Sequence, residues 1–316
     1  MKTKQLISGM IVAATILTAS ASAYAQSSSE TSAGSSSRGM SMPHGTTTAQ
    51  IPQMLSPKWA FSYVSFFSGP PVADLQSEST SAARDGYTLG LSLQNQLGVR
   101  YWLSEQLSIM PVFDFDYQFT DPHKTDTTGV SLVYDSFIKA KYIDAVKGYI
   151  EGNKASVDLE ARYYVPVGEF SRENESYGSV RLAAIPGIDL PEYGLQLSVL
   201  TYYRYWMQTN FYQVSTRYNI VPKNTVGLPE HTFYVGPQIN YRISKTFNAW
   251  LLYEQSHTID TLGFASTSDP RKSHTDIEPG IDIRLMNGVY ISPYLNWYTN
   301  QPIDTTSINL ITSITI

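Results

Sequence analysis

The sequence predicts an all-β chain that closes into a transmembrane, antiparallel, up-and-down β-barrel of about 12 strands. Three observations predict this fold class. Apolar and polar side chains alternate over segments that are too long for ordinary strands. The connections between these segments differ in length, some being tight turns and others long and polar. The N-terminus carries an export segment, so the mature chain is expected outside the cytoplasm.

The alternation is clearest between Gly86 and Phe119. Near the end of this stretch, Phe113 and Tyr117 fall on one face and Asp114 on the other. Ordinary strands have about five or six residues, whereas a tilted strand needs roughly 9–11 residues to cross a bilayer. Because every backbone amide in lipid must find a partner, such strands span a membrane only in a closed sheet. We therefore expect the apolar face to contact lipid and the polar face to line the interior.

Twelve such segments are expected, and the fourth is the least regular. Residues 130–150 also fit an amphipathic helix in a long loop. Single-chain bacterial barrels avoid odd strand numbers, which favours the strand. The expected segments are 58–67, 86–102, 106–119, 135–144, 155–167, 178–189, 194–208, 231–243, 246–259, 276–286, 289–299 and 306–316.

The connections predict which rim each one occupies, because membrane barrels have short turns on the periplasmic side and longer loops outside. One connection, 145–154, departs from this rule and is expected to be longer than a tight turn. The expected short turns are 103–105, 190–193, 244–245 and 287–288. The expected long loops are 68–85, 120–134, 168–177, 209–230 and 260–275.

The first 56 residues are not expected to belong to the barrel. Residues 1–25 have a basic start, an apolar stretch and a small-residue cleavage site, which is typical of a signal peptide. Residues 26–56 are rich in Ser and Thr and predict a flexible periplasmic leader. The barrel is therefore expected over residues 57–316.

Composition narrows the function classes. The chain has no cysteine, so disulfides and thiolate metal sites are excluded. It carries 22 basic and 27 acidic residues, for a formal net charge of −5, which disfavours a nucleic-acid partner. Charged residues make up 16% and aromatic residues 13%, a composition that suits an exported membrane barrel. No motif predicts a cofactor, a resident metal or a catalytic site.

The last segment carries Ile308, Leu310, Ile314 and Ile316 on one face. Here the chain resembles Gram-negative outer-membrane β-barrel proteins, in particular twelve-stranded, porin-like ones. The resemblance implies an outer-membrane location, contact with outer-membrane lipids and recognition of the last strand by the barrel-assembly machinery. The chain departs from the pattern by ending in Ile316, where an aromatic residue is usual. The tryptophans are expected to form interfacial girdles: Trp59, Trp102, Trp206, Trp250 and Trp297.

The inward phase of the segments predicts a nearly neutral lumen wall. A wall without a charge bias favours neither anions nor cations. The basic members are Arg100, Lys139, Lys141, Arg162, Arg181, Arg204, Arg242 and Arg284. The acidic members are Asp114, Asp116, Asp158, Glu160, Glu254, Glu278 and Asp282.

Three functions fit this wall. The favoured one is a porin-like passive channel for small polar solutes. The alternative is a structural barrel whose charges pair across the lumen and plug it, and which self-associates into a homo-oligomer. The third is an outer-membrane hydrolase that uses His231, His257 or His274 near the outer strand ends. An enzyme is the least favoured, because no histidine lies in a recognisable catalytic motif.

Overall fold

The structure of the chain is a computed structural model. The predicted signal peptide and leader lie outside the residues that it describes, as do most residues of the long connections. The described residues are 58–71, 92–120, 128–168, 171–172, 174–209, 228–260, 273–299, 303 and 306–316.

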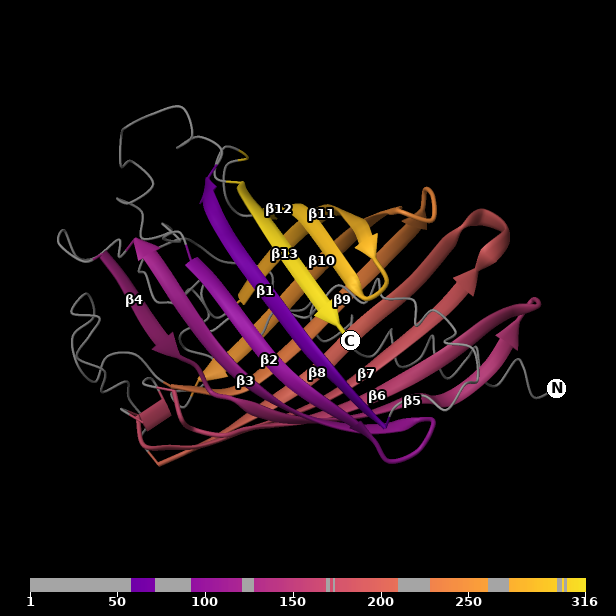
Figure 1. The fold of residues 1–316 in the computed structure, drawn as a ribbon. Helices are drawn as coiled ribbons and strands as arrows, with labels where there is room; N and C mark the ends of the chain where they lie inside the picture. The colour runs from indigo at the N-terminus through magenta and orange to yellow at the C-terminus, as the bar shows by residue number, and fades with distance from the viewer. Residues whose placement is uncertain are drawn as a thin grey trace.

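Strands make up most of the described chain (Figure 1). One short 3-10 helix, η2 (Pro191–Tyr193), forms part of a turn. The strands are β1 (Trp59–Pro71), β2 (Ser92–Trp102), β3 (Leu107–Thr120), β4 (Thr128–Val133), β5 (Phe137–Ile150), β6 (Asn153–Tyr164), β7 (Ser176–Leu190), β8 (Leu195–Gln208), β9 (Pro229–Arg242), β10 (Phe247–Asp260), β11 (Ser273–Met286), β12 (Val289–Tyr298) and β13 (Ser307–Thr315).

The sheet closes on itself as an antiparallel barrel. Successive strands pair around the ring, except that β4 and β5 both pair with β3. The ring closes where β13 pairs with β1, in register from Ser62 opposite Thr315 to Phe67 opposite Leu310. The ring has twelve strand positions, as expected from the sequence, and its strands are tilted (Figure 1). Among the described residues, no helix is long and apolar enough to cross a membrane.

The uncertain fourth segment is a strand. β5 pairs with the first half of β3 and β4 with its second half, so β4 and β5 share one strand position. They are separated by residues 134–136, where the Ser136 hydroxyl accepts a hydrogen bond from the Asp114 amide at 3.4 Å. The helix considered for residues 130–150 is therefore wrong in the described part of the chain.

The expectation of a long connection at 145–154 is also wrong. β5 continues to Ile150 and pairs with β6 down to Asn153, which leaves Glu151 and Gly152 as the turn. Both have positive φ, 51° and 84°, which is the geometry of a tight hairpin turn. A register shift before Val146 lets the pairing continue past the irregular middle of β5. The turn was not predicted from the sequence, because a glutamate is unusual at a position with left-handed backbone geometry.

The side-chain alternation has the expected sense. Ile109, Phe113 and Tyr117 of β3 are 37%, 47% and 39% exposed, whereas Met110 and Asp114 between them are 3% and 6% exposed. A barrel made of a single sheet buries side chains only on its inner face. The apolar set therefore faces outwards, and the polar set faces the interior.

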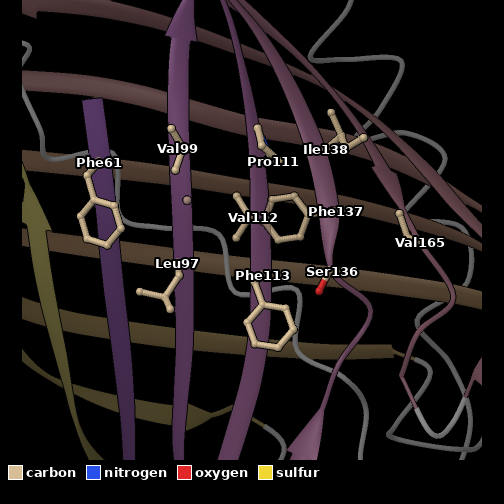
Figure 2. A pocket seen from close by; sticks show the side chains of 11 residues that line it. Phe61, Leu97, Val99, Pro111, Val112, Phe113, Ser136, Phe137, Ile138 and Val165 are labelled. Carbon is tan, nitrogen blue, oxygen red and sulfur yellow. The ribbon is translucent and has the colours of Figure 1, made fainter. Parts of the chain in front are cut away.

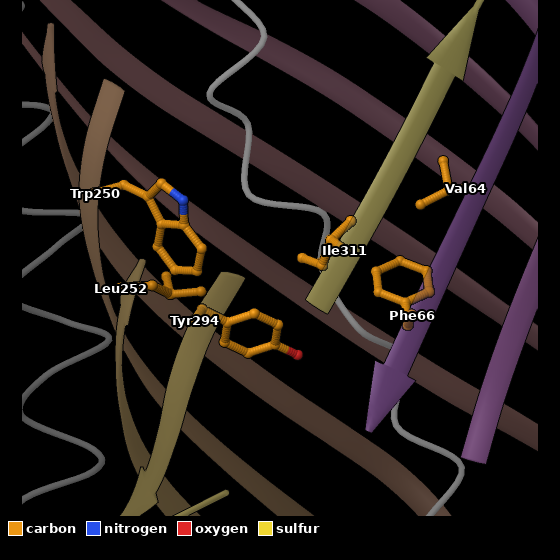
Figure 3. Close-up of a cluster of buried hydrophobic side chains, with 6 residues drawn as sticks. All are labelled: Val64, Phe66, Trp250, Leu252, Tyr294 and Ile311. Carbon is orange, nitrogen blue, oxygen red and sulfur yellow. The ribbon is translucent and has the colours of Figure 1, made fainter. Parts of the chain in front are cut away.

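The interior is less polar than the sequence predicted. Trp250 and Trp206 are buried, so the expectation that they belong to interfacial girdles is wrong for both. Trp250 shares the inward phase of Glu254, and Trp206 shares that of Arg204. Trp250 belongs to a cluster on four strands of the inner wall (Figure 3). That cluster contains Val64, Phe66, Trp250, Leu252, Tyr294 and Ile311.

The outer face carries an apolar groove of about 370 Å³ where β1, β2, β3 and β5 run side by side (Figure 2). The exposed side chains of Phe61, Val99, Phe113 and Ile138 line it together with Pro111. These residues have the outward phase of their strands. The groove is thus a feature of the barrel exterior and is separate from the charged interior.

Candidate functional site

A row of basic side chains crosses four adjacent strands of the inner wall. Lys139 of β5 lies opposite Arg162 of β6, Arg162 opposite Arg181 of β7, and Arg181 opposite Arg204 of β8. All four side chains are buried. We call this set the basic row. The sequence predicted each member as inward-facing, and the register of the strands brings them together.

A single carboxylate, Glu160, serves two members of the basic row. Its Oε1 atom accepts one hydrogen bond from Arg162 Nε at 2.5 Å and another from Arg181 Nη2 at 2.7 Å. Charge-assisted hydrogen bonds of this kind are strong, and removing one partner leaves buried charges without compensation. Glu160 therefore holds the two central guanidinium groups in place.

Aromatic rings fix the other faces of the arginines. The guanidinium carbon of Arg204 lies 3.9 Å from the ring centre of Tyr164 and 3.6 Å from that of Trp206. The guanidinium carbon of Arg181 lies 4.6 Å from the ring centre of Tyr202. Such cation–π contacts orient the guanidinium planes and leave their N–H edges for hydrogen bonds.

An acidic group begins two strands further round the barrel, on β10. Glu254 of β10 and Asp276 and Glu278 of β11 bring carboxylate oxygens within 4.8 Å of one another. The amide nitrogen of Asn296 donates to Glu278 and, at 3.2 Å, to Asp276. Asp276 was missed as an inward residue because it stands near a loop, although it shares the phase of Glu278.

Two stacked tyrosines connect the basic row with the acidic group. The rings of Tyr202 and Tyr234 are 4.5 Å apart and nearly parallel, at 9°. Arg181 stacks on Tyr202, and the Tyr234 hydroxyl donates to Glu254. The basic and acidic parts of the wall are thus separate but joined by a rigid aromatic bridge.

Two further acidic wall residues, Asp282 and Asp114, accept hydrogen bonds from neutral donors. Asp282 accepts from Trp250 Nε1 at 2.9 Å and from the Ser292 hydroxyl at 2.7 Å. Asp114 accepts from the amides of Gln94 and Gln96 at 2.9 and 3.0 Å. These carboxylates keep fixed positions on the inner wall.

Other predicted wall residues lie outside these groups. Lys141 forms an ion pair with Asp158 at 3.0 Å, and Arg100 lies over the ring of Trp102. Arg242 is exposed at the end of β9, and Arg284 donates to Asn287 at the β11–β12 turn. The Tyr134 hydroxyl donates to Asp116 at 3.2 Å.

The histidines considered for hydrolysis form no catalytic constellation that the described contacts reveal. His231 Nδ1 is hydrogen-bonded to the Tyr203 hydroxyl at 2.8 Å, and its ring stacks against Tyr203 and Tyr205. His257 is half-buried on β10. The side chain of His274 lies outside the described residues. The described geometry favours a structural role for His231.

Solved outer-membrane barrels share this architecture. The COG4313 outer membrane channel from Pseudomonas putida F1 aligns with a TM-score of 0.51 and 10% identity, over 83% of this chain and 97% of that chain. The chain has the fold of an outer-membrane β-barrel. The NanC porin aligns with a TM-score of 0.46 and 6% identity, over 81% of this chain and 98% of that chain. The KdgM porin, solved in complex with disordered oligogalacturonate, aligns with a TM-score of 0.42 and 8% identity, over 81% of this chain and 98% of that chain. No family model and no curated protein matches the sequence.

Proposed function

We propose that this chain is a porin-like channel of the bacterial outer membrane that passes small polar solutes passively. The observation that carries the proposal is the sorting of buried charges on the inner wall of a closed barrel. The basic row lies on β5 to β8, and the acidic group lies on β10 and β11. Charged rings and walls of this kind set the selectivity of pores.

The sorting of charge refines the sequence prediction of an unbiased wall. Basic and acidic residues are nearly equal in number, but the basic row and the acidic group lie on different strands of the barrel, β5 to β8 and β10 to β11. A polar solute that passes between them meets cationic donors on one side and carboxylate acceptors on the other. Such a wall suits solutes that carry both donors and acceptors, because each side can replace part of their hydration shell.

The proposal also assigns partners to the outer surface. The exposed apolar side chains of the strands contact outer-membrane lipids, and the last strand is the segment that the barrel-assembly machinery reads. The exported chain reaches the outer membrane after removal of residues 1–25. The oligomeric state of the folded protein is measured by sedimentation in detergent.

The test of the channel function is single-channel recording of the refolded chain in a planar bilayer. An open lumen gives steady current steps that grow with the salt concentration. Heat-modifiable mobility on a gel first confirms that the barrel is folded. Silence from folded protein would reject the channel.

One observation favours a second candidate, a structural barrel with a plugged lumen. The interior contains buried apolar clusters and the buried ion pairs of Glu160, which occupy space in a barrel of this size. This candidate predicts folded protein without current. The same recording therefore separates the two functions.

A further inference from the structure

The basic row contains buried donors that the protein itself does not use. Arg181 is 2% exposed, and its Nη2 atom donates to Glu160. Its Nε and Nη1 atoms are buried and have no hydrogen-bond partner. A buried guanidinium N–H without an acceptor is costly, so natural structures satisfy such groups with protein, water or a ligand.

A second unused polar group lies beside Arg181. The Tyr164 hydroxyl is buried and has no hydrogen-bond partner. Tyr164 lies opposite Ser179 in the β6–β7 register, two positions along β7 from Arg181. The Ser179 hydroxyl accepts a hydrogen bond from Arg204 Nε at 2.8 Å, and the Arg204 guanidinium stacks on the ring of Tyr164. Arg181, Arg204 and Tyr164 thus form one cluster on the inner wall.

The cluster carries an excess of positive charge. Glu160 pairs with Arg162 and Arg181. Among the described residues, no ion pair joins Lys139 or Arg204 to a carboxylate. Buried cations without counter-charges are unfavourable, and a bound anion would remove that cost.

We propose that Arg181, Arg204 and Tyr164 form a binding site for an oxyanion, the carboxylate or phosphate group of a small solute. Oxygen acceptors of this class match guanidinium and phenol donors in hydrogen-bond geometry and in charge. The stacking of Arg204 and Arg181 on aromatic rings prepares their orientation before the anion binds. This inference rests on the proposed channel function for the route by which the solute reaches the site.

Isothermal titration calorimetry on the full refolded chain in detergent tests the site. The probes are sodium acetate for the carboxylate and inorganic phosphate for the phosphate, each titrated against a constant chloride background. We expect saturable binding of at least one probe. The one that binds more tightly identifies the class of oxyanion.

Two substitutions locate the binding. Arg181→Met removes the unused donors and the charge and is expected to weaken binding by at least about tenfold, since hydrogen bonds to charged groups are the strong ones. Tyr164→Phe keeps the ring against Arg204 and removes only the hydroxyl, and is expected to weaken binding about threefold to tenfold. Lys245→Gln, at the exposed β9–β10 turn, is the matched control and is expected to bind like the wild type.

The outcomes distinguish this site from the channel. Folded wild-type protein that binds neither probe, or Arg181→Met protein that binds like the wild type, overturns the anion site. If Arg181→Met does not fold, Tyr164→Phe decides in the same way. Binding without single-channel current supports the anion site and rejects the channel. Current without binding supports the channel and rejects the anion site.

Discussion

Among the single residues of the interior, Glu160 has the most consequential contacts. It is almost fully buried, and one of its oxygens accepts from two guanidinium groups on adjacent strands. The sequence predicted that Glu160, Arg162 and Arg181 face inwards. It could not predict that they meet, because contact between side chains on different strands depends on the register of pairing. The alternation fixes the face, and the turns fix the register.

Replacement of Glu160 by Gln is expected to destabilise the barrel. The amide keeps the shape but leaves Arg162 and Arg181 without a counter-charge, a change that typically costs about 3–5 kcal/mol when the groups are buried. Urea unfolding in lipid vesicles, followed by tryptophan fluorescence, measures the free energy of unfolding. Glu151→Gln, at the exposed turn, is the control. A loss equal to that of the control would show that the ion pairs contribute little.

Among the elements, the β5–β6 hairpin has the largest influence on the site. Its turn sets the pairing of Lys139 with Arg162, and so places β5 in line with the rest of the basic row. Sequence analysis expected a connection longer than a tight turn at 145–154. The two-residue turn places Glu151, which is not a usual turn residue, at a positive φ. Trp206 and Trp250 were misplaced for a different reason: composition suggested girdles, whereas their positions two and four residues from Arg204 and Glu254 already put them on the inner face.

Substitution of Gly152 by Ala tests the hairpin. Gly152 has φ of +84°, a conformation that costs L-residues roughly 1–2 kcal/mol. The variant is expected to lose about 1 kcal/mol of unfolding free energy in the same urea experiment. Gly148→Ala in β5 is the matched control, because a methyl group there meets no neighbouring atom within 4 Å. An equal effect of the two substitutions would contradict the assigned turn.

At the scale of the whole molecule, closure of the ring determines which residues make up the inner wall. A closed single sheet has one inner face, and every inward position of twelve strands contributes to it. The fold class, the strand number and the facing of the charged residues could be predicted from the period of the sequence. The separation of the basic row from the acidic group could not, because it depends on which strands are neighbours around the ring and at which register. The apolar clusters were missed since polarity was assumed for the whole inner face.

The most direct test of the central claim, that sorted wall charges govern what passes, is the reversal potential in a KCl gradient. It is measured in planar bilayers for the wild type, Arg204→Gln and Glu254→Gln, with Lys245→Gln as control. Loss of a cation from the basic row is expected to shift the permeability ratio towards K⁺, and loss of a carboxylate from the acidic group to shift it towards Cl⁻. Shifts in the same direction, or reversal potentials equal to that of the control, would contradict the account.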